Sequence, residues 1–286
     1  MDCTSPIFGQ FPCGRCANCM ARSRQEWVFR LRMEYKECNF GLFVTLTYDD
    51  EKLPPDGVCK RDIQLFLKRL RKNFDSQVLR YFIISEYGDH THRAHYHGLL
   101  FFKCDRSNDI YDIIEQSWQN GFVQFGEIEE GSIVYCTKYC LKKSDVPQGM
   151  NPNFRLLSKM HGGIGIQHVL DLSDYYTPRL DKPQGVTSQE QTAPMPRYYR
   201  TKLLSRLLPE DQEEIKLLYQ MNLAEVHERQ EKKLLSLFKK QHPNLDPNSY
   251  RKVGFKARRE FDIWKLERSL RREDAIKNRT KKQNLM

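Results

Sequence analysis

Hydrophobic and polar positions follow two different periods between Met20 and Lys143. Short runs rich in β-branched and aromatic residues, bounded by turn residues, predict β-strands. Apolar positions three or four residues apart, set among Lys and Arg, predict amphipathic helices. The predicted strands are Gly41–Tyr48, Val78–Glu86, Ala94–Phe102 and Gly121–Ile128, and the predicted helices are Met20–Glu37, Asp62–Phe74, Ile110–Trp118 and Ser132–Lys143, with Ser132 as the N-cap of the last. This order predicts an α+β fold in which a central antiparallel sheet is flanked by helices.

The character of the sequence changes after residue 170. Residues 171–200 contain four prolines among Gln, Ser and Thr, a composition typical of a linker. The chain beyond them is mostly basic and helical in pattern, with breaks at His242-Pro243 and Asp246-Pro247. We therefore divide the chain into a Cys-rich N-terminal segment and helix (1–38), a central domain (39–170), a Pro-rich linker (171–200) and a basic helical C-terminal extension (201–286).

Charge and composition narrow the class of protein. The net charge is +10, and from Arg197 onward there are 23 Lys and Arg against 13 Asp and Glu, whereas the preceding 196 residues balance at 24 each. A basic tail predicts binding to a polyanion such as nucleic acid, although a solvated helical face is the alternative. We expect DNA contacts from Arg258, Arg259, Lys265, Arg271 and Arg272. The sequence has no long apolar run and no pattern of a signal peptide, so we expect a cytoplasmic protein without a membrane segment.

His95 and His97 are candidate metal ligands. Side chains alternate along a strand, so both project from the same face of the predicted strand Ala94–Phe102. A hairpin through Gly88 would lay Glu86 against this strand. Two imidazoles and a carboxylate suit Mg²⁺ or Mn²⁺ with open positions for phosphate oxygens. His90 and His92 are looser alternatives, and we expect them to be exposed in the hairpin loop.

Tyr135 and Tyr139 are candidate nucleophiles. Residues four apart in a helix are neighbours, so the two phenols lie side by side, and Lys138 and Lys142 fall in the same sector. An ordinary tyrosine is a poor nucleophile at neutral pH, but a nearby ammonium or metal ion favours the phenolate. The alternative is a half-buried helix with surface lysines.

These segments carry a resemblance to a known family. Phe43–Thr47, His95-Tyr96-His97 and Tyr135-x-x-x-Tyr139-x-x-Lys142 resemble the three motifs of HUH endonucleases, in the order found in rolling-circle replication initiators. The chain is more narrowly similar to the initiators of gokushovirus-type microviruses, which are small single-stranded DNA phages. That similarity covers about residues 10–170 and includes Cys13-Gly14-Arg15-Cys16-x-x-Cys19, Trp27, Ser85-Glu86-Tyr87-Gly88 and Ser158-x-x-x-Gly162-Gly163-Ile164-Gly165.

The resemblance implies an HUH-type fold and a nicking-joining reaction on origin DNA. By it, Glu86, His95 and His97 would hold the metal, and Tyr135 or Tyr139 would attack the phosphate to leave a 5′-phosphotyrosine. The second tyrosine would cut the regenerated origin, and Lys138 or Lys142 would assist. It does not say which tyrosine attacks first. Phe43–Thr47 would have a structural role.

The Cys-rich start is a second candidate metal site. Cys13, Cys16 and Cys19 supply three thiolates and Cys3 a fourth, which suits a structural Zn²⁺. An iron–sulfur centre and reduced thiols without a ligand are the alternatives.

Other functions compete with the nicking reaction. The glycines at 162–165 lack the Lys-Ser/Thr of a P-loop, and no such motif occurs elsewhere, so unwinding would fall to a host helicase and synthesis to a host polymerase. A non-catalytic nucleic-acid-binding protein and an HUH-type transposase remain the alternative functions.

Overall fold

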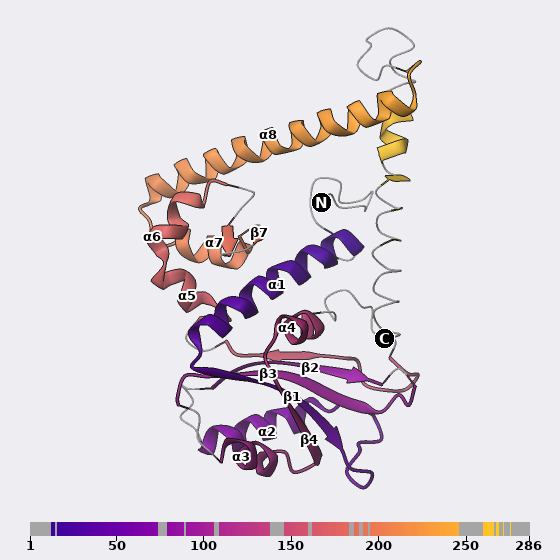
Figure 1. Cartoon of the computed structure of the whole chain (residues 1–286), viewed down its shortest axis with the longest axis vertical. Coiled ribbons are helices and arrows are strands. Elements are labelled where there is room, and N and C mark those ends of the chain that lie inside the picture. The colour runs from indigo at the N-terminus through magenta and orange to yellow at the C-terminus, as the bar shows by residue number, and fades with distance from the viewer. Residues whose placement is uncertain are drawn as a thin grey trace. The chain divides into compact units, whose positions relative to one another are not determined.

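The computed structural model forms two compact units, one of Glu26–Ser173 and one of Met1–Gln25 with Asp174–Met286 (Figure 1). No helix among the described residues is long and apolar enough to cross a membrane. The structure describes residues 13–14, 16–73, 79–88, 90–105, 109–137, 146–159, 162–182, 186–188, 191–193, 195–245, 260–265, 267–268, 271 and 275.

A five-stranded antiparallel sheet is the centre of the unit Glu26–Ser173. Its strand order is β4-β1-β3-β2-β5, so β3 lies in the middle between β1 and β2. The antiparallel sheet predicted from the sequence is confirmed, and β3 has the predicted bounds. The strands are β1 (Phe40–Tyr48), β2 (Leu79–Tyr87), β3 (Ala94–Phe102), β4 (Gly121–Glu127) and β5 (Arg155–Leu157).

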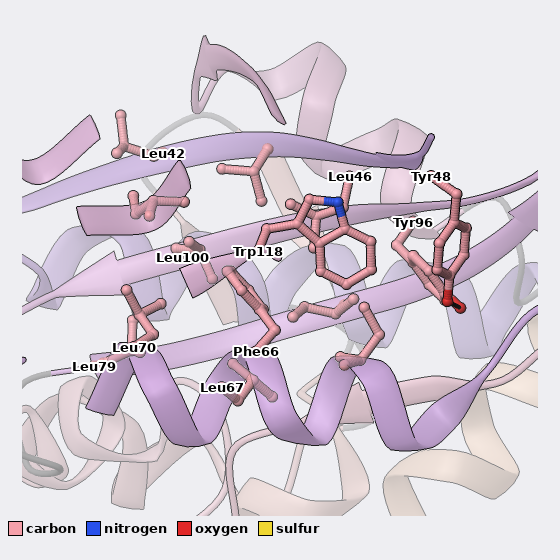
Figure 2. Packing of buried hydrophobic residues seen from close by; sticks show 14 of the residues in the cluster. Leu42, Leu46, Tyr48, Phe66, Leu67, Leu70, Leu79, Tyr96, Leu100 and Trp118 are labelled. Carbon is pink, nitrogen blue, oxygen red and sulfur yellow. Dashed lines mark hydrogen bonds between the residues drawn. The ribbon is translucent and has the colours of Figure 1, made fainter. Parts of the chain in front are cut away.

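One face of the sheet packs against α2 (Lys60–Asn73) and α3 (Ile110–Ser117). Alternate residues of β1 and β3 turn toward α2, whose apolar stripe is fully buried, and Trp118 fills the space after α3 (Figure 2). Burial of these side chains is the main stabilising contribution on this face. The residues of this core that Figure 2 labels are Leu42, Leu46, Tyr48, Phe66, Leu67, Leu70, Leu79, Tyr96, Leu100 and Trp118.

The opposite face packs against α4 (Glu130–Thr137) and the C-terminal half of α1 (Ala17–Glu37). Leu31 of α1 and Ile133 of α4 meet Phe82 and Leu99 of the sheet in a second apolar cluster. Arg32 of α1 pairs with Glu130 of α4. The two helices thus share one face of the sheet, and it is this face that carries the odd-numbered side chains of β3.

A buried ion pair fixes α1 to the sheet. Glu34 Oε1 lies 2.6 Å from Nε of Arg80 on β2, and both side chains are nearly excluded from solvent. Glu34 also accepts a hydrogen bond from the Gly165 amide at 2.6 Å, while Arg80 donates to the Gly162 carbonyl. The glycine-rich segment before α5 (Ile166–Asp171) is therefore tied to both elements.

Two sequence predictions need correction. Ser132 is not the N-cap of the tyrosine helix, because α4 begins at Glu130 and Ser132 Oγ accepts a hydrogen bond from the Glu129 amide. Ser132 thus satisfies an amide from the first turn instead of preceding that turn. Strand β5 was not predicted at all. It has three residues and joins the sheet beside β2, with Arg155 opposite Ile84.

The second unit is mainly helical beyond residue 195. The segment predicted as a linker contains α6 (Ser173–Tyr176), a 3-10 turn (Thr177–Arg179), the strands β6 (Val186–Ser188) and β7 (Gln191–Ala193), and the start of α7 (Arg197–Leu204). The long helix α8 (Pro209–Gln241) ends just before the predicted break at His242. Phe238 near its end packs with Phe261 and Trp264.

Candidate active site

The register of β3 with its two neighbours brings the predicted metal ligands together. Glu86 on β2 is the cross-strand partner of His95, as the hairpin through Gly88 predicts. Thr45 on β1 is the cross-strand partner of His97. Odd-numbered residues of β3 face α4, so both imidazoles project toward that helix. His90 and His92 are exposed, as expected.

Glu86 Oε2 is the centre of the site. It lies 3.6 Å from Nε2 of His95 and 3.4 Å from Nε2 of His97. The ligand atoms of the three residues all lie within 4.8 Å of one another. A carboxylate oxygen and two imidazole nitrogens that converge in this way could hold one divalent ion.

Hydrogen bonds orient both imidazole rings. Nδ1 of His95 lies 3.0 Å from the Arg93 carbonyl oxygen, which can only accept, so Nδ1 carries the proton and the Nε2 lone pair points to the site. Nδ1 of His97 lies 3.0 Å from Thr45 Oγ1. The ring of Phe43 stacks on His97, with centroids 5.7 Å apart and planes 5° from parallel. These contacts are of the kind that hold metal-binding histidines in place.

The protonation states suit a cation. Burial alone raises the pKa of Glu86, but hydrogen bonds from His95, His97 and Tyr135 outweigh it and lower the pKa to about 2. Burial lowers the pKa of His97 below its usual value. At neutral pH Glu86 is thus a carboxylate and His97 is neutral, the forms that bind a metal ion.

Tyr135 reaches the site from α4. Its hydroxyl donates to Glu86 Oε2 at 2.8 Å and lies 3.3 Å from His97 Nε2. Ile133, Cys136 and Thr137 of the same helix are buried, so the described part of α4 packs as the predicted pattern requires. Tyr139, Lys138 and Lys142 lie outside the described residues, and their roles stay predictions.

Comparison with known proteins identifies the family. Residues 41–144, which contain all three motifs, match the family model of replication-associated proteins of the ORF2 type. The chain is 30% identical over 213 residues to the replication-associated protein VP4 of Bdellovibrio phage phiMH2K, a match covering 66% of this chain. The chain belongs to the phage replication-associated proteins.

Another phage protein matches this replication-associated protein more distantly. The replication-associated protein ORF4 of Chlamydia phage 1 is 24% identical over 225 residues, or 71% of this chain. The aligned segments span 66% of the length of the Bdellovibrio phage relative and 55% of the Chlamydia phage relative. No solved structure matches the chain.

Sequence reasoning missed Thr45 as a member of the site of this replication-associated protein. It assigned the strand Phe43–Thr47 a structural role, whereas Thr45 and Phe43 both contact His97. The signal that finds Thr45 is the strand register, because Thr45 is directly opposite His97. That register depends on which strands are neighbours, which the local pattern does not encode.

The predicted DNA-binding residues lie in the second unit of the replication-associated protein. Lys265 and Arg271 are exposed and stand within ion-pair range of Asp262 and Glu267. Arg258, Arg259 and Arg272 lie outside the described residues. Helix α8 itself is not basic, because it contains seven Asp and Glu against six Lys and Arg. Its basic residues gather at its C-terminal end, where Lys232, Lys239 and Lys240 line a shallow hollow with Leu235 and Ser236.

Proposed function

We propose that this replication-associated protein initiates rolling-circle replication by nicking and rejoining single-stranded origin DNA. The observation that carries the proposal is the meeting of a phenol hydroxyl with a Glu–His–His group. Tyr135 donates to Glu86 Oε2 at 2.8 Å and lies 3.3 Å from His97 Nε2. A nucleophile beside a group able to hold a divalent ion is the arrangement that phosphodiester cleavage needs.

The donor set fits the cofactor that the proposal requires. Glu86 offers an ionised carboxylate, His97 a neutral ring, and His95 an Nε2 lone pair directed by the Arg93 carbonyl. Bound Mg²⁺ or Mn²⁺ would withdraw charge from the non-bridging oxygens of the scissile phosphate. Hard oxygen ligands and imidazole together favour these ions over softer ones.

The protein residues divide the remaining steps. The Tyr135 oxygen attacks phosphorus and its proton is lost, with Glu86 the nearest acceptor at 2.8 Å. The bond from phosphorus to the 3′ oxygen breaks, leaving a 5′-phosphotyrosine and a 3′ hydroxyl that primes synthesis by a host polymerase. Tyr139 would make the second cut after one round, and the 3′ hydroxyl released there would attack the first phosphotyrosine to close the circle. Lys138 or Lys142 would favour the phenolate by its positive charge.

The location and partners follow from this role. Origin DNA of a phage that infects bacteria is replicated in the host cytoplasm, so the chain would act there. It has no P-loop, and a host helicase would therefore supply unwinding. The basic C-terminal extension would hold DNA through phosphate contacts, with affinity that falls as salt rises.

A suicide-substrate assay tests the proposal. The protein is incubated with 3′-labelled single-stranded fragments that tile the cognate genome, with Mn²⁺ or with EDTA, and covalent adducts are resolved on a denaturing gel. We expect a metal-dependent adduct with one fragment, retained in Tyr111→Phe and lost when Tyr135 and Tyr139 are both replaced by Phe. Tyr111 is a matched control because it is a helical tyrosine that packs on Phe125 instead.

The alternatives predict other results. A non-catalytic nucleic-acid-binding protein would bind the same fragments without any adduct and would be unaffected by EDTA. An HUH-type transposase would form an adduct at the ends of a mobile element instead of at the replication origin. An adduct that persists in the double Phe variant would refute the tyrosine mechanism.

A further inference from the structure

A cluster of three thiols lies at the start of α1. Cys13, Cys16 and Cys19 place their sulfur atoms within 4.8 Å of one another, and all three side chains are half-buried. No disulfide joins these cysteines. The other described cysteines, Cys38, Cys59, Cys104 and Cys136, do not belong to any such group among the described residues.

The distance between two of the sulfurs fits ligands of a single metal ion. Cys13 Sγ and Cys19 Sγ are 3.9 Å apart. Zinc–sulfur bonds of about 2.3 Å in a tetrahedron separate two thiolates by about 3.8 Å. In an iron–sulfur cluster each thiolate binds a different iron, which requires wider separation of the sulfurs. A disulfide requires about 2.05 Å.

The local backbone favours negative sulfur atoms. The Cys16 amide donates to Cys13 Sγ at 3.3 Å, as amides do around metal-bound thiolates. The Cys16 carbonyl accepts the first helical hydrogen bond from the Met20 amide, so Cys16 stands at the N-cap of α1 and Cys19 lies in its first turn. The positive end of the helix dipole stabilises anions at these positions. The first turn of α1 contains no acidic residue that would use this field.

We propose that Cys13, Cys16 and Cys19 are three ligands of a structural Zn²⁺ ion. On binding, each thiol loses its proton and forms a sulfur–zinc bond, so occupancy rises with pH. The ion joins residues three and six positions apart and thereby fixes the start of a 21-residue helix. The same helix carries Leu31 and Glu34, which are buried against the sheet that holds the candidate active site. The ion would therefore stabilise the fold without taking part in phosphodiester chemistry.

Metal content of the full-length chain tests this proposal. The protein is purified without chelators or added metal, and zinc, iron and acid-labile sulfide are measured. We expect about one zinc per chain in the wild type and in Cys104→Ser, and a loss of at least most of it in Cys16→Ser and in Cys19→Ser. Cys104 is the matched control because it is half-buried and lies outside the cluster.

Exchange into Co²⁺ identifies the ligands in the wild-type protein, so the proposal stays testable even where a Ser variant does not fold. Three thiolates give a sulfur-to-cobalt charge-transfer band and the intense visible bands of a tetrahedral site. Cobalt held by Glu86, His95 and His97 gives no charge-transfer band from sulfur. Absence of stoichiometric zinc, zinc without a thiolate signature, or iron with sulfide would each overturn the proposal. The readout is independent of DNA nicking and is therefore unaffected if the proposed function is wrong.

Discussion

Thr45 Oγ1 lies 3.0 Å from Nδ1 of His97, across the pairing of β1 with β3. This contact fixes the ring through the nitrogen that faces away from Glu86, and leaves Nε2 directed at the Glu–His–His group. Thr45 is therefore a positioning residue for His97. It contacts neither the ion nor the DNA in the proposed reaction.

Replacing Thr45 by Val should weaken the use of metal. Val keeps the shape of the side chain but removes the hydroxyl, so His97 loses the partner that orients it. Loss of such a partner typically reduces metal affinity 10- to 100-fold, and we expect the Mn²⁺ needed for half-maximal nicking to rise about 10-fold or more. Thr45→Ser keeps the hydroxyl and should behave like the wild type. An unchanged Mn²⁺ requirement in Thr45→Val would show that the contact does not matter.

Acid should destabilise the metal-free protein through Glu86 and His97. The folded-state pKa of Glu86 is about 2, below its usual value, so its contribution is full above the unfolded-state pKa and is lost as pH falls through that range toward 2. The pKa of His97 is also lowered, so the unfolded state binds its proton first and stability falls below about pH 6.5. Urea unfolding between about pH 7 and pH 4 should show this loss. Its part below about pH 5 should shrink in Glu86→Gln.

Strong alkali should unfold the protein through a pair of buried phenols. The Tyr48 hydroxyl donates to Asp62 and lies 2.8 Å from the Tyr96 hydroxyl, which also accepts from the Cys59 amide. Burial raises the pKa of Tyr96 to about 12 and raises that of Tyr48 further. Because the folded state keeps these protons, stability is full below about pH 10 and is lost above it. Tyrosinate absorbance should therefore increase together with loss of the near-ultraviolet dichroism.

Tyr48→Phe tests the same pair at neutral pH. It removes the donor to Asp62 and should lower the free energy of unfolding by about 1–3 kcal/mol. Tyr175→Phe is the control, because Tyr175 is exposed. Equal unfolding midpoints in the two variants would contradict the prediction.

Breaking the Glu34–Arg80 pair should be costly. Glu34→Ala leaves the Arg80 guanidinium buried without its carboxylate and removes the acceptor of the Gly165 amide. Loss of one partner of a buried pair typically lowers the free energy of unfolding by about 3–5 kcal/mol. Glu225→Ala is the control, since it removes an exposed i,i+4 pair with Arg229 and should change stability little. Chemical denaturation measures both.

Replacing both partners separates charge from packing. Glu34→Met combined with Arg80→Met removes both charges while it keeps side-chain volume, and it should be more stable than Glu34→Ala alone. A double variant less stable than the single one would show that the pair itself, and not the stranded charge, holds α1 on the sheet.

The sequence was a good guide where local pattern decides the structure. The strand Ala94–Phe102 is bounded by a turn and rich in apolar residues, and its ends were predicted correctly. The position of Glu86 opposite His95 followed from a short hairpin, because a short loop leaves little choice of register. Both features depend on residues close together in the chain.

The features that the sequence did not reveal depend on distant partners. Strand β5 is too short to show alternation and is defined by its pairing with β2. The pair of Glu34 and Arg80 was invisible because charged residues on an amphipathic helix are ordinarily exposed. Thr45 became part of the site only through its cross-strand neighbour. Ser132 was misplaced because its hydroxyl bonds to an amide three residues earlier in sequence, which local propensity does not distinguish from a cap.

Adjacent residues of β3 belong to different layers of the protein. His95 and His97 face α4 and the candidate active site, while Tyr96 between them is fully buried in the opposite core, with its hydroxyl bonded to Cys59 and Tyr48. Natural selection on this strand therefore acts through two separate failures at neighbouring codons. Changes at the odd positions are screened by the reaction, and changes at the even positions by the yield of folded protein, so tolerance to substitution should itself alternate along the gene.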